Sequence, residues 1–205
     1  MSGPAAGLVL AAGAGTRFEP SELKLLAELG GRPLLERPVA ALCAVPELTR
    51  VVVVLGAGAG QVRDRLTFGR AEPIVCEEWA EGLSASLRCG VAALPEAERI
   101  VVTLGDVPGV RPEVVHRLLA APDGSRATYG GRPGHPVVLG AAQLRRVGEL
   151  SGDRGARALL DGGVHIECGD LASGRDVDTV ADLDALRRAP GPGRPLWRRD
   201  FGQPL

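Results

Sequence analysis

The residues best suited to chemistry stand near the start of the chain, in a loop of small residues followed by two cations. Residues 8 to 10 are apolar and predict a short buried strand. Residues 11 to 15 carry no side chain larger than a methyl group, so backbone N–H groups there can approach an anion. Arg17 and Lys24 follow with positive charge. This combination predicts a phosphate-binding loop, whereas an ordinary tight turn would explain the glycines but not both cations.

A second stretch with binding potential runs from Trp79 to Arg88. Here Gly82 is followed by Ser84, Ser86 and Arg88 at a predicted junction between a loop and a helix. Such a junction offers backbone N–H groups, short hydroxyl donors and a charge, which suit a nucleotide base or an anion. Helix capping by Ser84 is an equally good explanation, because serine is a preferred N-cap residue.

Carboxylates suited to a metal follow two predicted strands. Asp106 comes soon after the apolar run 100–104, and ligands of open α/β sheets collect outside the carboxyl ends of strands. One such Asp, together with substrate phosphates, is enough to begin a Mg²⁺ site. Asp176 and Asp178 lie on the same side of a predicted extended segment, so one of them can join Asp106. Asp182 is explained by the dipole of the helix that it begins.

Two later segments carry side chains suited to a phosphorylated substrate. His135 stands between Gly134 and Pro136 in a predicted loop, which would fix the direction of its ring; a plain surface histidine is the alternative. Arg154 and Arg157 stand near the start of a predicted helix, and arginine forks match phosphate oxygens. A capped turn that faces solvent would also explain these arginines.

Length and composition narrow the class of protein. The chain has 205 residues, a formal net charge of −1 and four scattered cysteines that indicate neither a zinc site nor a disulfide framework. We expect a single domain over residues 1–188 and a Pro- and Gly-rich tail over residues 189–205. The balanced charge argues against nucleic-acid binding, and no apolar run suggests a membrane span or a secretory signal. We therefore expect a cytoplasmic protein with no nucleic-acid or membrane partner.

Apolar runs alternate with helical patterns along the chain, which is typical of an α/β protein with a mostly parallel sheet. The expected strands are 8–10, 51–55, 72–76, 100–104, 127–129, 137–139 and 164–168, and the expected helices include 34–42, 84–94, 112–119 and a last helix ending near 188. Gly56, Gly58 and Gly60 lack the spacing of a dinucleotide fingerprint and an acidic ribose partner. We read them as a plain turn, which disfavours a Rossmann oxidoreductase.

Six motifs, in this order, resemble the MobA-like NTP transferase family and most closely its molybdenum cofactor cytidylyltransferase group. The motifs are Leu10–Gly13 with Arg17 and Lys24, Trp79–Arg88, Leu104–Pro108, Gly134–Pro136, Gly152–Arg157 and Asp176–Thr179. The resemblance extends over nearly the whole chain to about residue 186. It implies a three-layer α/β/α Rossmann-like nucleotidyltransferase fold with a mostly parallel, mixed sheet.

The resemblance also implies an activity. A Mg²⁺-dependent enzyme of this kind transfers a nucleoside monophosphate from an NTP to a phosphorylated small molecule, such as the molybdopterin cofactor, and releases pyrophosphate. Ala12 stands where guanylyltransferase relatives more often carry glycine, which favours CTP. A molybdoenzyme is an implied partner. No nucleophilic side chain is required, because positioning and electrostatic stabilisation dominate such transfers.

Matched motif by motif, the resemblance assigns roles to the residues singled out above. Arg17, Lys24 and Asp106 form the implied catalytic set, and Asp106 and Asp178 are the implied metal ligands. The implied nucleotide-binding set is Leu10, Ala11, Ala12, Gly13, Ala14, Gly15, Arg17, Lys24, Gly82, Ser84, Ser86 and Asp106. The implied acceptor-binding set is Gly134, His135, Pro136, Arg154 and Arg157.

One segment departs from the family pattern. The run from Arg17 to Lys24 is two residues longer than in the family and lacks its glycine, which can displace Lys24. The stretch from Gly15 to Ser21 also resembles sugar-1-phosphate nucleotidylyltransferases. Transfer from GTP or another NTP to a sugar phosphate or other small phosphate acceptor is therefore the first alternative. A non-catalytic, nucleotide-binding chaperone for molybdoenzyme maturation is the second.

Overall fold

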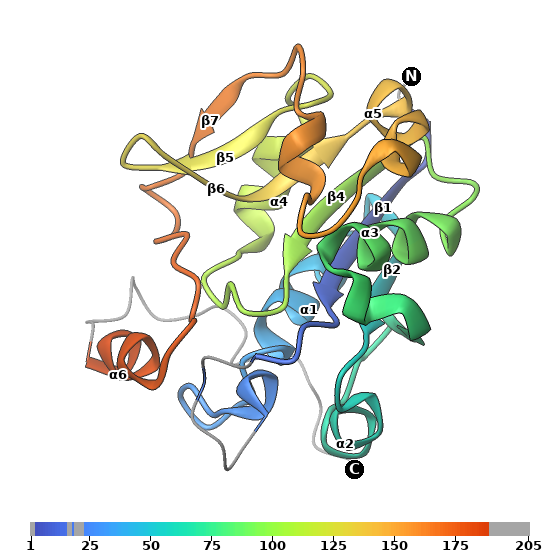
Figure 1. Cartoon of the computed structure of the whole chain (residues 1–205). Helices are drawn as coiled ribbons and strands as arrows, with labels where there is room; N and C mark the ends of the chain where they lie inside the picture. The colour runs from blue at the N-terminus through green and yellow to red at the C-terminus, as the bar shows by residue number, and fades with distance from the viewer. Residues whose placement is uncertain (1–2, 16–17, 19–22, 189–205) are drawn as a thin grey trace, which may run out of the picture.

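The computed structural model describes residues 3–15, 18 and 23–188; the predictions for Arg17 and for the tail 189–205 lie outside these residues. Seven strands form one sheet in the order β3-β2-β1-β4-β6-β5-β7 (Figure 1). Among the described strands, β6 alone runs antiparallel to its neighbours, and the other pairings are parallel. The strands are β1 (Ala5–Ala11), β2 (Leu48–Leu55), β3 (Glu72–Val75), β4 (Arg99–Leu104), β5 (Arg126–Tyr129), β6 (Arg132–Leu139) and β7 (His165–Glu167).

Helices cover both faces of this sheet, which confirms the predicted three-layer architecture (Figure 1). Helices α1 and α4 pack on one face, and α3, η3 and η4 pack on the other. No helix in the described part of the chain is long and apolar enough to cross a membrane. The α-helices are α1 (Glu36–Cys43), α2 (Ala59–Arg65), α3 (Leu83–Ala92), α4 (Pro112–Leu119), α5 (Ala141–Arg145) and α6 (Val180–Arg188), and the short 3₁₀ helices are η1 (Lys24–Leu26), η2 (Glu77–Glu81), η3 (Val147–Glu149) and η4 (Ala156–Leu159).

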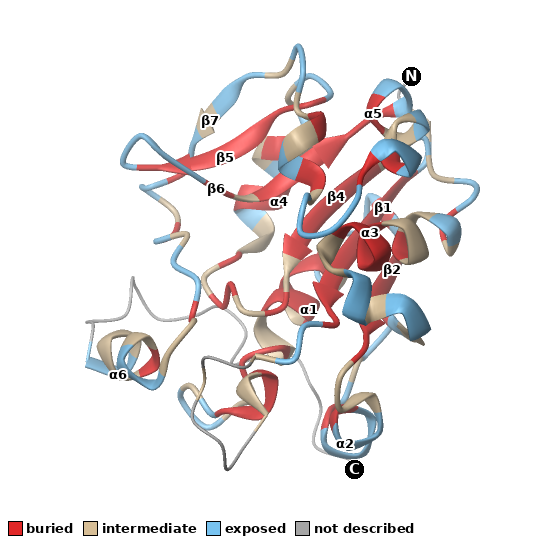
Figure 2. Cartoon of the chain, viewed as in Figure 1, coloured by how far each residue is buried: buried red, intermediate tan, exposed pale blue. Residues whose placement is uncertain are grey.

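Alternation along the strands builds two hydrophobic cores, one on each side of the sheet. In β1, Val9 packs with α1 and α4, whereas Leu8 and Leu10 pack with the α3 side. Successive side chains of a strand point to opposite faces, so a central strand must be apolar throughout. Figure 2 shows the resulting band of buried residues along β1, β2 and β4.

The segment 130–136 differs from its predicted form, because His135 lies in strand β6 and not in a loop. Gly130 and Gly131 have φ angles of 58° and 74° and complete the reversal between β5 and β6 on their own. Two glycines with positive φ are what a two-residue hairpin turn needs, so the strand resumes at Arg132. The sequence signal was present in this glycine pair, and the prolines at 133 and 136 obscured it.

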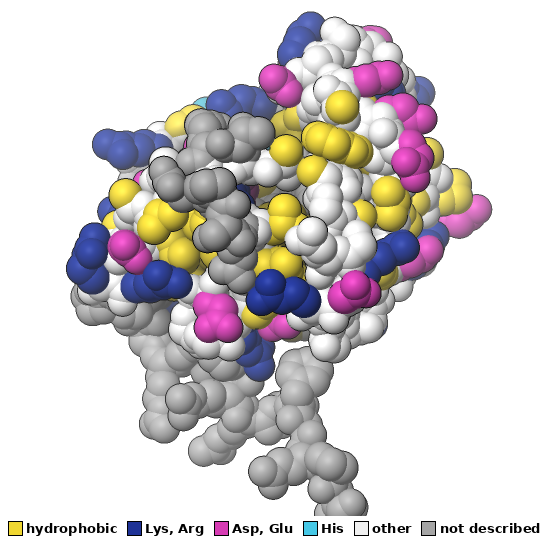
Figure 3. All heavy atoms as spheres, turned by 60° about the horizontal axis from the view of Figure 1, so that its bottom comes forward, with side chains coloured by type: hydrophobic (Ala, Val, Ile, Leu, Met, Phe, Trp, Pro, Cys, Tyr) yellow, Lys and Arg dark blue, Asp and Glu magenta, His cyan; other side chains and the backbone are white. Residues whose placement is uncertain are grey.

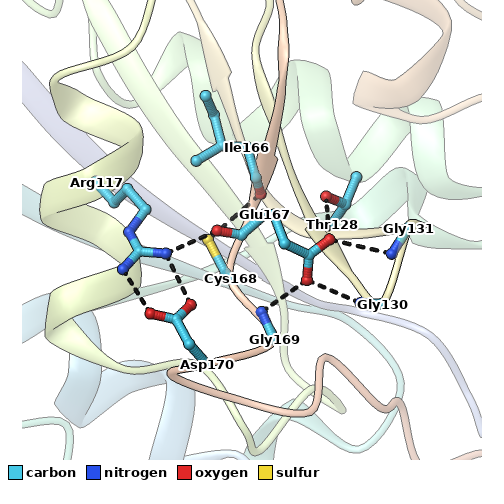
Figure 4. A network of polar contacts seen from close by, with 9 residues as sticks. All are labelled: Arg117, Thr128, Gly130, Gly131, Ile166, Glu167, Cys168, Gly169 and Asp170. Atoms are coloured by element: carbon cyan, nitrogen blue, oxygen red, sulfur yellow. Dashed lines mark hydrogen bonds and ion pairs between the residues drawn. The ribbon is translucent and has the colours of Figure 1, made fainter.

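The tip of this hairpin is held by a carboxylate from β7 (Figure 4). Glu167 Oε1 accepts the N–H groups of Gly130 at 2.8 Å and Gly169 at 2.9 Å. Glu167 Oε2 accepts the N–H of Gly131 at 3.0 Å and the hydroxyl of Thr128 at 3.0 Å. These hydrogen bonds, chiefly those from the backbone, lower the pKa of Glu167 to about 2. The network fixes the β5–β6 hairpin to its neighbour β7.

The strand order places a crevice between β1 and β4. The chain passes from β1 to β2 and β3 on one side of the sheet, whereas β4 lies on the other side of β1. At such a switch point, the loops after the two central strands separate and leave room for a ligand. Residues 11–15 follow β1, and Asp106 follows β4, so the fold brings both predicted motifs to this point.

Candidate active site

A pocket opens at this crevice, between the glycine loop and the loop after β4. Small and apolar residues line this pocket, together with two charged side chains, Lys24 and Asp106. It contains several of the predicted nucleotide-binding residues, but Ala12 instead packs in the core. The lining residues are Leu10, Ala11, Gly13, Ala14, Gly15, Leu23, Lys24, Leu25, Ala57 and Asp106.

Lys24 joins the two predicted metal ligands. Its Nζ lies 2.6 Å from Asp106 Oδ2 and 3.2 Å from Asp178 Oδ1. The lysine side chain is only 10% exposed, and it is the single lysine among the 24 Lys and Arg residues of the chain. A compact ammonium, unlike a guanidinium, can sit between two carboxylates as a point charge. The longer segment before Lys24 therefore does not displace this residue from the site.

The glycine loop packs directly against this lysine. A Cβ atom built on Gly15 would lie 3.1 Å from Lys24 Cβ, and Gly15 has a φ of 61°. Both features favour glycine, since a larger residue would be strained and would press on the lysine. The loop and the cation are thus held as one unit at the pocket.

Backbone contacts bring Asp178 to Asp106. The N–H of Val177 donates to the main-chain oxygen of Asp106 at 2.9 Å. Asp182 Oδ2 accepts the N–H groups of Asp178 at 3.2 Å and Thr179 at 2.8 Å, and the Thr179 hydroxyl at 2.7 Å. Asp182 therefore caps α6 through specific hydrogen bonds, which lower its pKa, in addition to any dipole effect. This cap fixes the segment that presents Asp178.

Asp106 keeps one oxygen available. Asp106 Oδ1 is buried and has no hydrogen-bond partner among the residues that the structure describes. A buried carboxylate oxygen without a partner is costly, so a ligand or cation at this position would be favourable. The described residues contain no group of three or more His, Cys, Asp or Glu side chains placed to hold a metal. A cation here would accordingly need further ligands from a substrate.

The motif at residues 79–88 lies beside the pocket but outside its lining. Trp79 packs against Gly56, where an added Cβ would come within 2.6 Å of both the Trp79 ring and the main-chain oxygen of Ala12. Ser84 and Ser86 are buried, and Ser84 does not cap the helix, because Gly82 is the N-cap residue and no side-chain hydrogen bond is made there. Nucleotide binding by the Gly82, Ser84 and Ser86 motif stays a prediction.

The loop at residues 152–155 packs against this junction. The N–H of Ser84 donates to the oxygen of Gly152 at 3.0 Å, and a Cβ atom on Gly82 would lie 2.6 Å from Gly152. The predicted helix after this loop is only the short η4, in which Arg157 is exposed; Arg154 is exposed before it. Arg88 is taken up by structural contacts with the oxygen of Leu150 and the carboxylate of Glu81.

His135 lies next to the strand that leads to Asp106. Its Nδ1 is 3.5 Å from the main-chain oxygen of Val102 in β4. Burial and, to a smaller extent, the positive charges of Arg126 and Arg157 lower the pKa of His135 to about 4. The imidazole is therefore neutral at pH 7. Gly134 and Pro136 beside it are buried in β6.

Arg126 is a candidate that sequence reasoning missed. It is 7% exposed and begins β5, within a short strand that is otherwise uncharged. The predicted strand begins one residue later, at Ala127, so Arg126 lies outside it and no local signal marks it as buried. On the surface, basic and acidic side chains are interspersed at the carboxyl-end face of the sheet, which Figure 3 turns toward the viewer.

Comparison with known proteins agrees with this geometry. The chain is 35% identical over 195 residues to "Nicotine blue oxidoreductase" of Paenarthrobacter nicotinovorans, covering 88% of this chain and 95% of that protein. It is 39% identical over 127 residues to the "Bifunctional protein GlmU" of Corynebacterium aurimucosum, but this match covers 58% of the chain and only 26% of GlmU.

A solved structure of similar form contains manganese. The structure of Rv0371C in complex with manganese, from Mycobacterium tuberculosis, has a TM-score of 0.71 and 26% identity, covering 91% of this chain and all of that one. The family model described as "MobA-like NTP transferase domain" matches residues 7–168 of this chain, which include the glycine loop, Lys24 and Asp106. The chain therefore belongs to the MobA-like NTP transferase family and, with it, to the nucleotidyltransferases.

Proposed function

We propose that this protein transfers a nucleoside monophosphate from an NTP, with CTP favoured, to a phosphorylated small molecule such as the molybdopterin cofactor, and releases pyrophosphate. The observation that carries the proposal is the cluster of Lys24, Asp106 and Asp178 beside the glycine-loop pocket. The lysine, the two carboxylates and the backbone of the glycine loop lie together at the carboxyl ends of the strands, where α/β sheets bind ligands. The preference for CTP rests on the family resemblance, since the Ala12 methyl group lies in the core.

The cluster fits a divalent cation, which we infer to be Mg²⁺ held by Asp106 and Asp178. Carboxylate oxygens are the ligands that Mg²⁺ takes together with substrate phosphates, and Asp106 Oδ1 lacks another described partner. When bound, Mg²⁺ would neutralise the phosphate charge that repels an anionic acceptor. The nearby lysine would compete with the cation for the same oxygens, so substrate phosphates are expected to draw Lys24 away from them.

The chain itself performs binding, orientation and charge stabilisation. The small residues 11–15 leave their backbone accessible to the triphosphate, and Lys24 and Arg17 supply the positive charge beside it. The neutral His135 can hydrogen-bond an acceptor phosphate without adding charge, whereas Arg154 and Arg157 add it. We assign no general base, because the attacking phosphate oxygen is already ionised at neutral pH.

A two-substrate screen tests the proposal. Pyrophosphate release would be measured with CTP, GTP, ATP and UTP, each with Mg²⁺, against molybdopterin and sugar phosphates. We expect turnover with CTP and molybdopterin, and a loss of roughly 100-fold or more in Asp106→Asn with the fold retained. Asp184→Asn is the matched control, because Asp184 pairs only with Arg187 on α6 among the described residues.

The other outcomes identify the alternatives. Turnover with a sugar phosphate alone would favour the sugar nucleotidyltransferase class. Nucleotide binding with no turnover for any pair would refute the enzyme proposal and favour a chaperone for a molybdoenzyme. An Asp106→Asn variant with full activity would remove Asp106 from the catalytic set.

A redox reaction on a small molecule is the second candidate function. The observation that favours it is the 35% identity to a protein named as an oxidoreductase, over nearly its whole length. The pocket can receive a dinucleotide pyrophosphate as well as a triphosphate, since both are bound through backbone N–H groups. Oxidation of NADH or NADPH in the presence of quinonoid dyes tests this candidate. No consumption of either reductant would eliminate it.

A further inference from the structure

A buried arginine without a carboxylate partner lies beneath the predicted acceptor residues. Arg126 Nη2 donates to the oxygen of Gly134 at 3.3 Å, while Arg126 Nε is buried with no partner among the described residues. No described carboxylate forms an ion pair with this guanidinium. Arginine side chains are rarely buried unless they are paired. An anion bound beside Arg126 would therefore stabilise its buried charge.

The strand register places Arg126 and His135 on the same face of the sheet. Arg126 pairs with Val137 of β6, and His135 lies two residues before Val137. Side chains two apart along a strand share a face, although the register shift between β5 and β6 falls within this stretch. The hydrogen bond from Arg126 Nη2 to the oxygen of Gly134, the residue before His135, independently places the guanidinium beside this part of β6.

The third cation comes from η4. Val137 shares a core cluster with Ala156 and Leu159, which places η4 over β6 on the same face as Arg126. Arg157 lies between these two buried residues in the sequence and is itself exposed, and its side chain makes no hydrogen bond or ion pair with another described residue. Burial lowers the pKa of Arg126, and the positive charge of Arg157 lowers it further, so the two guanidinium groups are close enough to interact. Asp176 is an acidic group whose charge also reaches His135.

We propose that Arg126, Arg157 and His135 form an oxyanion site that receives the phosphate group of the acceptor. This inference rests on the proposed transferase function and adds a residue, Arg126, to its acceptor side. Two planar guanidinium forks can each present paired donors to phosphate oxygens. With Nδ1–H directed at the Val102 oxygen, the neutral imidazole can accept a hydrogen bond at Nε2 from a protonated phosphate oxygen. His135 lies against Val102 of β4, the strand that leads to Asp106, so the proposed site and the nucleotide pocket are connected through this strand.

The alternative is that Arg126 only braces the hairpin through Gly134. These two roles differ in what they predict for phosphate binding by a folded Arg126 variant. A structural role for Arg126 would leave the phosphate affinity unchanged when its guanidinium is removed and the fold is retained. An oxyanion site would lose affinity when either arginine is removed.

The test is calorimetric titration of the full chain with inorganic phosphate, in the absence of nucleotide and with CTP and Mg²⁺ at saturation. We expect Arg126→Gln and Arg157→Ala each to weaken phosphate binding about tenfold or more, as loss of a charge-assisted hydrogen bond would do. Arg145→Ala, an exposed arginine on α5, is the matched control and should change the affinity less than twofold. If Arg126→Gln does not fold, Arg126→Lys, which keeps the charge but removes the paired guanidinium donors, replaces it and should weaken phosphate binding as well.

Three results would overturn the inference: no phosphate binding, wild-type affinity in a folded variant of either arginine, or displacement of phosphate by the nucleotide. Displacement would mean that the arginines hold the triphosphate and not the acceptor. The titration requires no turnover. Arginine-dependent phosphate binding in a protein that turns over no NTP would therefore uphold the site while refuting the transferase proposal.

Discussion

Replacement of Lys24 by methionine tests how the candidate active site is assembled. Methionine keeps an unbranched stem that can pack against Gly15, but it removes the charge that lies 2.6 Å from Asp106 and 3.2 Å from Asp178. The two carboxylates are then left near each other without their cation. The variant should lose stability in the absence of metal, and divalent ions should restore part of it.

The size of the effect follows from the burial of the three groups. At an effective dielectric constant of about 20, each contact is worth roughly 5 to 6 kcal/mol of gross attraction. Desolvation of the charges offsets most of this. Solvent screens the Asp178 contact further, since that side chain is 35% exposed. A net loss of about 1 to 3 kcal/mol remains, which lowers Tm by roughly 3 to 9 °C in a domain of this size.

The assay is thermal unfolding of wild type and Lys24→Met, with and without Mg²⁺ or Mn²⁺. We expect the metal to raise Tm more in the variant than in wild type, because the ion no longer competes with an ammonium. Asp178→Asn is the matched control and should be milder than Lys24→Met, since it removes only the longer, more exposed contact. Because Lys24 is the single lysine, selective ¹⁵N-lysine labelling gives one side-chain ammonium signal that reports directly on its pairing.

The reasoning would be refuted by a Lys24→Met variant with the stability and metal response of wild type. That result would mean that the lysine does not pair with these carboxylates in solution. A variant that unfolds entirely and is not restored by metal would instead show that the lysine acts mainly through packing. That result would also contradict the prediction that Lys24 stabilises the fold through its ion pairs with the two carboxylates.

Further predictions concern the scaffold and its pH dependence. Gly90→Ala should lower stability by about 1 to 3 kcal/mol, because an added Cβ would lie 2.4 Å from Leu8 Cδ1; Gly60→Ala, with open space around it, is the control, and equal Tm values would contradict the packing argument. The pKa of His135 is lowered from 6.5 to about 4, so the stability that it contributes is present above pH 6.5 and is lost as the pH falls through 4. In the His135→Gln variant, the free energy of unfolding measured with urea should change less between pH 6.5 and pH 4 than in wild type, by at most about 3 kcal/mol. An unchanged pH profile would disprove this prediction. The pKa of Glu167 is lowered to about 2, so Glu167→Gln should lower Tm at pH 7 and reduce the loss of stability from pH 4.5 to 2; an unaltered acid transition would count against the hairpin clamp.

Local patterns in the sequence determined the helices and strands, and they also pointed to the glycine loop and to Asp106 of the candidate site. The run 51–55 and the run 100–104 each read as a buried strand, and both lie within strands of the structure. The helix at 112–119 was predicted at its observed bounds. The small-residue loop after β1 and Asp106 after β4 needed only the rule that ligands gather at the carboxyl ends of strands. Such features depend on neighbouring residues, so one sequence suffices to find them.

Tertiary structure alone decided how the site is completed. Lys24 is 82 residues from Asp106 and 154 from Asp178, and no local pattern records which distant carboxylate a lysine will reach. Asp178 arrives through the backbone bond from Val177 to Asp106, which exists only once the sheet has formed. The burial of Arg126 likewise appears only in the folded chain, where its side chain donates to Gly134 of β6. The physical reason is that periodicity determines which face a residue occupies, whereas the packing of distant segments determines what that face meets.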